Sequence, residues 1–395
     1  MSFNAFPKET RNILDSVPEL IKKTFPVPGR FRGALPSNIA ELSRLLTNGR
    51  GDRSLSYLAR PNFLSAYLHY FMPWNLYRLC LLLPSLSLNL KSGDTITDIG
   101  SGPLTFASAL WIARSDLRSI PLEINCIDRC APALEAGKNF FTALCNSTGE
   151  SVMWKINIIK EDIDIRRNVM RKRKKAALVC AVNMFNEIYE TLSHNNTGGL
   201  KSMAVKAAQA MHNEALPDAS ILTVEPGVPQ AGRFISFLRS AFMELERPPV
   251  SPCPHTETCP FTADGGKTRW CHFAFETDNA PKELHRLSTA AKLPKERLVF
   301  SFLLTGGASS QSRAEKTGEK VRVISDMFPL SEMIHERSNK RLSFGRYGCS
   351  AQGLVLLTGE KSSIEKISSL SLVSPVLSAN GQRDKKSGAL IMEIQ

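Results

Sequence analysis

The sequence lacks any long hydrophobic run. No stretch of its 395 residues approaches the roughly 18–20 apolar residues of a membrane-spanning helix, and the leucine-rich piece Leu79–Leu83 is closed by Pro84. The first twenty residues carry acidic side chains and no apolar core segment, which argues against a secretory signal or a transit peptide. We therefore expect a cytoplasmic protein that makes no membrane contact.

Acidic residues are scarce relative to basic ones. The chain has 37 Asp and Glu against 50 Lys and Arg, a formal net charge of +13, which points to a polyanionic partner, most often nucleic acid. With 43% apolar and 22% charged residues, the composition is that of a globular protein, so disorder is excluded as the dominant state.

Much of the positive charge is local. Seven cations lie within ten residues, 166–175, and no acid interrupts them. This run is either a solvated charged face or a contact surface for the phosphate backbone of RNA, whose binding would then depend on salt. The residues that we assign to RNA binding are Arg171, Lys172, Arg173, Lys174 and Lys175.

Internal repeats are also absent, and changes in the sequence pattern divide the chain into four regions. Residues 1–90 are predicted to form a helical N-terminal region, and residues 91–247 a cofactor-binding domain. Residues 248–375 form a cysteine-rich segment with C-terminal strands, and residues 376–395 a flexible tail. In the second region, strands alternate with helices, which predicts an α/β fold with a doubly wound, mainly parallel sheet.

A glycine turn, Asp98–Leu104, separates the first predicted strand from a helix. Gly100 and Gly102 would let a cofactor approach the backbone, and the helix N-terminus offers free N–H groups. Asp128 ends the second strand, where a carboxylate can accept hydrogen bonds from ribose hydroxyls. Asp162 follows the third strand, where it could meet an adenine edge.

Two cofactor classes fit this turn. A dinucleotide is one, but the full Gly-x-Gly-x-x-Gly fingerprint is missing because position 105 is Thr. The turn from Asp98 resembles the Asp-x-Gly-x-Gly turn of class I methyltransferases, which bind S-adenosylmethionine. Leu104 stands where those enzymes usually carry a third glycine, and we expect its side chain to crowd the methionine end of the cofactor.

A catalytic motif is missing. Amino-methylating enzymes commonly carry an Asn- or Asp-Pro-Pro-aromatic run after the fourth strand, and this chain has Asn183–Tyr189 there. Asn186 and Glu187 are the candidates for lining a methyl pocket, although helix capping explains them equally well. Cys180, inside a predicted buried strand, is expected to be an inert core thiol.

Nine cysteines without a secretion signal indicate a reducing compartment, in which clustered thiols are more often metal ligands than disulfides. Cys253, Cys259 and Cys271 fall within 19 residues but lack paired Cys-x-x-Cys spacing. Thiolate ligands suit zinc and iron–sulfur clusters alike. The candidates for a fourth ligand are Cys349, His255 and His272.

Several strings together resemble the methyltransferase-like small-ribosomal-subunit protein family, over roughly residues 40–360. They are Tyr57-Leu-Ala-Arg-Pro61, Asp98-Ile-Gly-Ser-Gly-Pro103, Phe185-Asn-Glu-Ile188, Val224-Glu-Pro-Gly227, Pro252-Cys-Pro-His255, Cys259-Pro260, Trp270-Cys-His-Phe273 and Leu298-Val-Phe-Ser-Phe302. The cysteine-containing strings are the most specific of these.

The resemblance implies a class I S-adenosylmethionine-dependent methyltransferase fold and binding to the rRNA of the small ribosomal subunit. It also implies a 4Fe-4S cluster, carried here by Cys253, Cys259, Cys271 and Cys349. Mitochondrial members are regarded as inactive methyltransferases that assist small-subunit assembly, and we expect a monomer away from the ribosome. The alternatives are an active rRNA methyltransferase and a zinc-stabilised methyltransferase acting on a small molecule or a protein.

Overall fold

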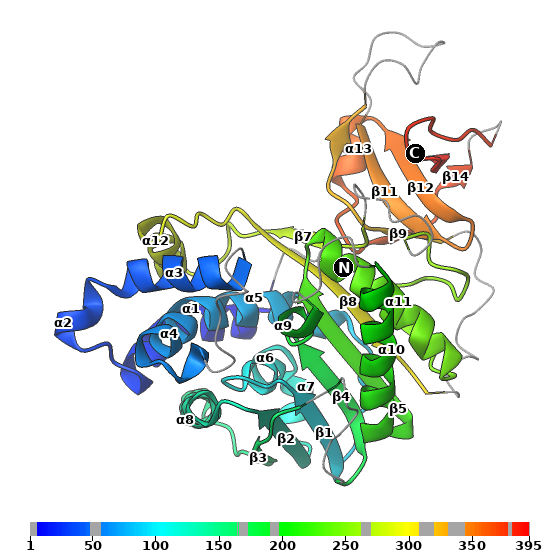
Figure 1. The fold of residues 1–395 in the computed structure, drawn as a ribbon. Coiled ribbons are helices and arrows are strands. Elements are labelled where there is room, and N and C mark those ends of the chain that lie inside the picture. The colour runs from blue at the N-terminus through cyan, green and yellow to red at the C-terminus, as the bar shows by residue number, and fades with distance from the viewer. Residues whose placement is uncertain are drawn as a thin grey trace.

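The computed structural model describes residues 6–47, 57–163, 165, 173–189, 197–261, 270–307, 320–330, 344–377 and 381–394. Within these ranges the chain forms a large sheet with helices packed on it and a smaller C-terminal sheet, drawn in orange and red in Figure 1. None of the helices found there combines the length and the apolar character that a membrane crossing requires.

The large sheet has a parallel half and an antiparallel half. Its strand order is β3-β2-β1-β4-β5-β8-β6, and β7 also pairs with β8. Strands β1 to β5 run parallel, whereas β8 runs antiparallel to β5. The bounds are β1 Asp94–Ile99, β2 Leu122–Asp128, β3 Trp154–Lys160, β4 Ala176–Val182, β5 Ala215–Pro226, β6 Pro249–Ser251, β7 Phe273–Glu276 and β8 Arg297–Thr305.

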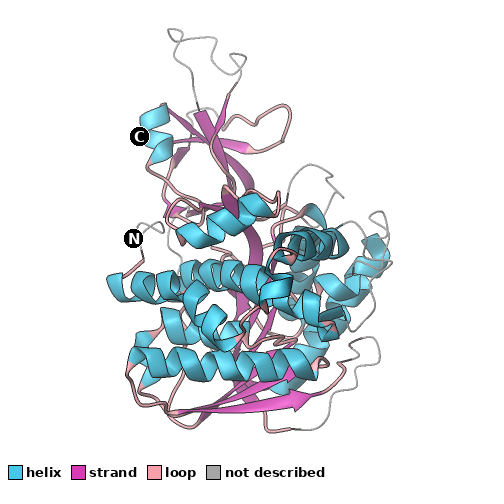
Figure 2. Ribbon diagram, turned by 90° about the vertical axis from the view of Figure 1, so that its left-hand side faces the viewer, coloured by secondary structure: helices cyan, strands magenta, loops and turns pink. Residues whose placement is uncertain are grey.

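Both faces of this sheet are buried. Successive side chains of a strand point to opposite faces, so a strand that is covered on both sides contributes to two apolar clusters. In β4, Leu178 and Cys180 belong to one apolar cluster, and Val179 and Ala181 belong to another. Figure 2 shows the helices stacked against the strands. The central helices are α6 Thr105–Ala113, α7 Ser115–Arg118, α8 Ala131–Thr148, α9 Asn186–Tyr189, α10 Thr197–Glu214 and α11 Pro229–Glu244.

The described part of the N-terminal region consists of helices, and it packs into the same apolar cluster as α6 and α8. Its elements are α1 Lys8–Thr24, α2 Gly29–Arg32, α3 Leu35–Thr47, η2 Tyr57–Ala59, α4 Pro61–Ala66, η3 Tyr67–Phe71, α5 Met72–Leu82 and η4 Leu83–Ser85, and α12 Lys282–Ala290 lies beside α3. The aromatic side chains of α4 and α5 are buried, so they form a core face.

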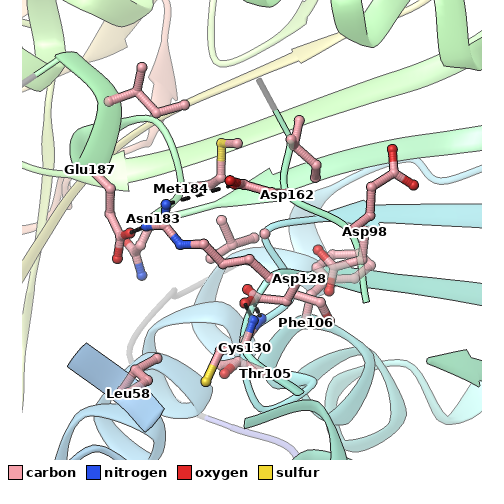
Figure 3. A pocket seen from close by; sticks show the side chains of 18 of the residues that line it. Leu58, Asp98, Thr105, Phe106, Asp128, Cys130, Asp162, Asn183, Met184 and Glu187 are labelled. Atoms are coloured by element: carbon pink, nitrogen blue, oxygen red, sulfur yellow. Dashed lines mark hydrogen bonds and ion pairs between the residues drawn. The ribbon is translucent and has the colours of Figure 1, made fainter. Parts of the chain in front are cut away.

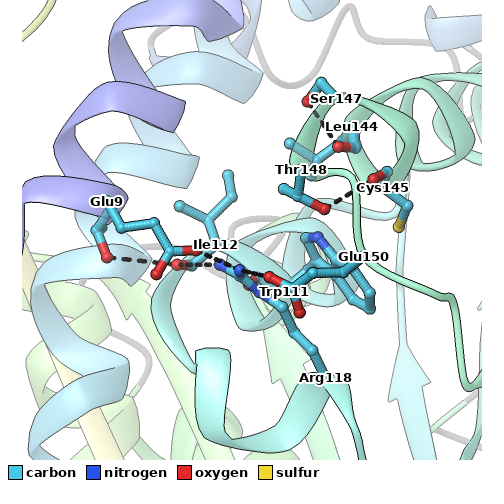
Figure 4. Close-up of polar contacts among 10 residues, drawn as sticks. Glu9, Trp111, Ile112, Arg118, Leu144, Cys145, Ser147, Thr148 and Glu150 are labelled. Carbon is cyan, nitrogen blue, oxygen red and sulfur yellow. Dashed lines mark hydrogen bonds and ion pairs between the residues drawn. The ribbon is translucent and has the colours of Figure 1, made fainter.

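A buried arginine joins α1 to the sheet domain (Figure 4). Arg118 is 1% exposed, and its guanidinium forms ion pairs with Glu9 of α1 and with Glu150 after α8. It also donates hydrogen bonds to the backbone oxygens of Trp111 and Ile112, at 2.7 and 3.4 Å. Since a buried guanidinium needs all of these acceptors, the N-terminal helix is fixed to the end of α6.

The smaller sheet has the order β13-β9-β11-β12-β15-β14, and β10 pairs with β11. Its elements are β9 Val321–Val323, β10 Phe328–Pro329, β11 Phe344–Ser350, β12 Gly353–Gly359, α13 Lys361–Glu365, β13 Leu372–Val373, β14 Val376–Leu377 and β15 Leu390–Glu393. The segment expected to be a flexible tail instead supplies β15, which pairs parallel to β12 and buries Leu390 and Met392. Burial of these apolar side chains holds it in the sheet.

Candidate functional site

A cavity of about 390 Å³ opens at the carboxyl ends of β1, β2 and β4. The strand order reverses between β1 and β4, and in open α/β sheets ligands bind at such a switch point. The volume lies in the range of small-molecule sites, about 300–1,000 Å³. All five predicted cofactor residues line this cavity, namely Asp98, Gly100, Gly102, Asp128 and Asp162.

Asp128 holds the glycine turn in place. Its Oδ2 accepts a hydrogen bond from the Gly102 N–H at 2.9 Å, and its Oδ1 accepts one from the Cys130 N–H at 2.8 Å. Gly102 has a positive φ of 53°, a conformation that glycine adopts readily. Each carboxylate oxygen can accept a second hydrogen bond, so Asp128 can position the turn and still accept hydroxyl groups from a ligand.

Asp98 lies deeper. It is 1% exposed, its Oδ1 lies 3.4 Å from the Cys180 Sγ, and its Oδ2 has no hydrogen-bond partner. Burial raises the pKa of this carboxyl to about 7. The Thr105 Oγ1 at the cavity wall is also buried without a partner. A ligand with an amino group and hydroxyl or carboxyl oxygens would satisfy both atoms, so the residues present fit S-adenosylmethionine.

A chain of polar contacts joins the loops around the cavity (Figure 3). The Tyr57 hydroxyl donates to Glu187 Oε1 at 2.8 Å, and Arg129 Nη2 donates to Glu187 Oε2 at 3.0 Å. Arg129 Nη1 lies 3.9 Å from Asp162 Oδ1. The N-terminal region therefore contributes a wall of the cavity, through Tyr57 and also Tyr67, which the local sequence pattern did not indicate.

The two catalytic candidates do not present free groups to the cavity. Asn186 is not a lining residue: its backbone N–H donates to Glu225 Oε2 at 3.1 Å, and its side-chain Oδ1 is buried without a hydrogen-bond partner among the described residues. Glu187 lines the cavity but accepts hydrogen bonds from Tyr57 and Arg129 on its two oxygens. Asn183, Met184 and Ile188 of this segment also line the cavity, although no local sequence pattern singles them out. Asn183 Oδ1 accepts a hydrogen bond from Arg78 at 3.4 Å.

The expectation that Leu104 crowds the cofactor is wrong. Leu104 is 0% exposed, belongs to the apolar cluster under α6 and is not a lining residue. Its φ of 54° lies in the left-handed region, which glycine adopts at no steric cost. The glycine that methyltransferases usually carry there therefore serves a backbone conformation, which leucine adopts here with strain.

The four predicted cysteine ligands are close enough to interact electrostatically, although one of them belongs to the C-terminal sheet. Cys253, Cys259 and Cys271 lie between β6 and β7, and Cys349 lies in β11 of the C-terminal sheet. Burial raises the pKa of Cys271 well above its ordinary value, and the charges that the other three thiols would carry raise it further. Burial and the charges that Cys253 and Cys259 would carry raise the pKa of Cys349 in the same way.

Arginine and histidine side chains surround these thiols. Arg239 and Arg322 act electrostatically on Cys253 in the direction that lowers its pKa, against the larger effect of burial. His255 Nε2 lies 3.2 Å from Cys349 Sγ. His272 Nδ1 instead lies 2.9 Å from the Trp270 backbone oxygen. In the part of the chain that the structure describes, no group of His, Cys, Asp or Glu is arranged to hold a metal ion.

The basic run divides into three parts. Arg171 and Lys172 lie outside the described residues. Arg173 is not available for phosphate contact, because its guanidinium is 11% exposed and forms ion pairs with Glu161 and Glu214 at 2.8 and 3.1 Å. Lys174 and Lys175 are exposed.

Comparison with solved structures returns methyltransferases of low similarity. A methyltransferase from Pyrococcus furiosus is 8% identical, with 58% of this chain and 81% of that chain covered and a TM-score of 0.30. A putative class I S-adenosylmethionine-dependent methyltransferase from Listeria monocytogenes is 7% identical, with 76% and 87% covered and a TM-score of 0.33. These TM-scores are too low to transfer a function.

Comparison by sequence gives a family. No curated protein matches the chain. The family model described as "Mitochondrial small ribosomal subunit Rsm22" matches residues 66–330, well over half of the sequence. The matched range includes the cavity loops at the ends of β1, β2 and β4 and three of the four clustered cysteines. The chain belongs to the mitochondrial small ribosomal subunit Rsm22 family.

Proposed function

We propose that this protein is a methyltransferase-like factor that binds the small ribosomal subunit, contacts its rRNA, and assists its assembly or translation. The observation that carries the proposal is the family match over residues 66–330. The net charge of +13 supports an RNA partner, because neutralising phosphates releases counterions. We further propose a cytoplasmic location and a monomer away from the ribosome.

The cavity is proposed to hold S-adenosylmethionine. Asp128 and the Gly102 backbone would receive the ribose, and the buried oxygen of Asp98 would accept the amino group. When bound, this cofactor supplies an electrophilic methyl group. The engagement of Glu187 by Tyr57 and Arg129 occupies both oxygens of the carboxylate that was the candidate for the methyl pocket, which favours a binding role over methyl transfer.

We propose a 4Fe-4S cluster on Cys253, Cys259, Cys271 and Cys349. Thiolate ligands suit iron–sulfur chemistry, and a bound cation would offset the thiolate repulsion that, in addition to burial, raises the pKa of Cys271. Bound there, the cluster supplies a covalent link between the large sheet and β11. Iron and sulfide analysis after anaerobic purification tests this, and a colourless protein that carries zinc would refute it.

Co-sedimentation with small ribosomal subunits at graded salt tests the partner directly. The wild-type protein is expected to pellet with the subunits, and its affinity should fall as salt rises. Replacing Lys174 and Lys175 by Gln should reduce the slope of log affinity against log salt by roughly 1–2, the share of two phosphate contacts. Lys201→Gln, at an exposed position of α10, is the control and should leave the slope unchanged.

Two results would count against the proposal. If the protein stays in the supernatant at low salt, the small subunit is not its partner. If the protein pellets but the double variant keeps the wild-type slope, then subunit binding stands and the assignment of Lys174 and Lys175 to phosphate contact is wrong.

A further inference from the structure

The two glycines of the turn differ in what occupies the space beside them. A Cβ built on Gly102 would meet nothing within 4 Å. A Cβ built on Gly100 would lie 2.3 Å from Met184 Cγ and 2.8 Å from Met184 Cβ. The Met184 side chain therefore packs directly against the α-carbon of Gly100, on the side that the missing side chain leaves bare.

This contact lies inside the cavity. Gly100 and Met184 are both lining residues, and Figure 3 draws Met184 among the other side chains that line the cavity. Met184 also packs against the apolar cluster on the α10–α11 face of the sheet. The Met184 side chain thus occupies the space beside Gly100 in which a ligand could otherwise approach the backbone.

The order of the strands indicates which part of a bound nucleoside ligand would contact Met184. Asp128 ends β2, Gly100 follows β1, and Met184 follows β4, and these three strands are neighbours. Adjacent strands lie about 4.8 Å apart, so a ligand with its ribose at Asp128 reaches Met184 only after it has crossed β1. In S-adenosylmethionine, the part that extends beyond the ribose is the sulfonium with its amino-acid tail.

We propose that Met184 is the specificity-determining side chain of this cavity. It fills the space over Gly100 that the amino-acid tail would take, so the cavity selects its ligand by the adenosine part. The inference rests on the proposed cofactor site and deepens it, because it adds tail-free adenosine nucleosides to the ligands that this site accepts. Methionine is unbranched and adaptable, so a tailed ligand binds only by displacing it from Gly100.

Isothermal titration calorimetry with adenosine and with S-adenosylhomocysteine tests the assignment on the full chain. Wild-type protein is expected to bind the two ligands with affinities within about threefold of each other. Met184→Ala should tighten S-adenosylhomocysteine at least tenfold and leave adenosine within twofold. Met184→Leu, which keeps the side-chain volume, is the matched control and should behave like the wild type.

A measurement on the unaltered protein guards against a folding defect in the alanine variant. The ε-methyl NMR signal of Met184, identified by its absence in Met184→Leu, should move when S-adenosylhomocysteine binds and stay in place when adenosine binds. The inference is overturned if both ligands bind and neither the alanine variant nor this signal distinguishes them. If neither ligand binds any form of the protein, the proposed cofactor site fails as well.

Discussion

Asp98 and Asp128 end neighbouring strands, yet their carboxylates have different surroundings. Asp128 accepts two backbone N–H bonds, whereas Asp98 is 1% exposed and one of its oxygens has no partner. Burial disfavours the charged form of a carboxyl, which is why the pKa of Asp98 rises to about 7. The unliganded cavity therefore contains a carboxyl that titrates near neutral pH.

This shift predicts a pH dependence of stability. The folded-state pKa of Asp98 lies above the ordinary value of 3.8, so the folded protein binds more protons between about pH 4 and pH 7. The contribution of Asp98 to the free energy of unfolding is thus present at acid pH and lost as pH rises through 7. The free energy of unfolding of Asp98→Asn, measured relative to that of the wild type, should therefore rise by about 1–3 kcal/mol between pH 4 and pH 8.

Urea denaturation across that range provides the measurement, and Asp116→Asn provides the control. Arg114 lowers the pKa of the exposed Asp116 below its ordinary value of 3.8, so the stability difference between Asp116→Asn and the wild type should stay nearly constant between about pH 4 and pH 8. A pH-independent difference between Asp98→Asn and the wild type would contradict the prediction.

Leu104 allows a second prediction at a single position. Glycine there would relieve about 1–2 kcal/mol of left-handed strain but would remove a fully buried side chain, which costs about 2–5 kcal/mol. Leu104→Gly should therefore be less stable than the wild type, and Leu104→Ala less stable still, because it keeps the strain. Thermal denaturation ranks the three, and an alanine variant more stable than the glycine variant would be inconsistent with this account.

The packing of α8 on the glycine turn is a close backbone contact between two elements beside the cavity. Gly137 of α8 lies against the turn so closely that a Cβ on it would lie 2.3 Å from the Pro103 carbonyl carbon and 2.7 Å from the Leu104 nitrogen. These are backbone atoms, which cannot rotate away as a side chain can. The helix and the turn therefore hold each other in place.

Gly137→Ala should consequently destabilise the protein by about 1–3 kcal/mol, although alanine is the better helix former. Gly198, in α10, is the matched control, because a Cβ there would meet nothing within 4 Å. Gly198→Ala should be neutral or stabilising by up to about 1 kcal/mol. Urea denaturation of both variants is the measurement, and equal stabilities would show that α8 can shift away from the turn.

The sheet elements were largely predictable from the sequence, whereas their long-range partners were not. β4, Ala176–Val182, is a short apolar run between polar segments, which is typical of a buried strand. β11 has no such signal, because Gly345, Arg346 and Gly348 interrupt its apolar pattern. Its register is set by distant packing, since a Cβ on Gly348 would lie 2.3 Å from a Val321 methyl carbon.

The candidate site shows the same difference between residues that a local pattern predicts and residues that tertiary packing places. Asp98 and Asp128 could be predicted because each ends a recognisable strand at the edge where ligands bind. Tyr57 and Met184 reach the cavity only through tertiary packing, and Tyr57 meets Glu187 across 130 positions of the sequence. No local period or spacing encodes such a contact.

At the scale of the whole molecule, two sheets meet around the four thiols. Arg322 of β9 donates hydrogen bonds to the Pro252 and Leu370 backbone oxygens, at 2.8 and 2.6 Å. The Ser369 Oγ accepts one from the Ala274 N–H at 3.1 Å. The proposed cluster would add a covalent link to these few polar contacts.

Removal of iron should therefore loosen the C-terminal sheet more than the large sheet. Hydrogen–deuterium exchange is expected to accelerate at least tenfold in β11 and β12 after anaerobic chelation, while β1 and β4 stay protected. Cys349→Ser should reproduce this change, whereas Cys145→Ala, at a buried thiol of α8, should not. Identical exchange with and without iron would mean that the thiols do not couple the sheets.

The origin of Cys349 in a separate sheet also sets an order of events during synthesis. Cys271 precedes Cys349 by 78 positions, which at about 5–20 residues per second correspond to roughly 4–16 s of translation. Three thiols are therefore exposed together for seconds before the fourth exists. If the proposed cluster is correct, a metal or an oxidant that meets the nascent chain in that interval finds only three of the four proposed ligands.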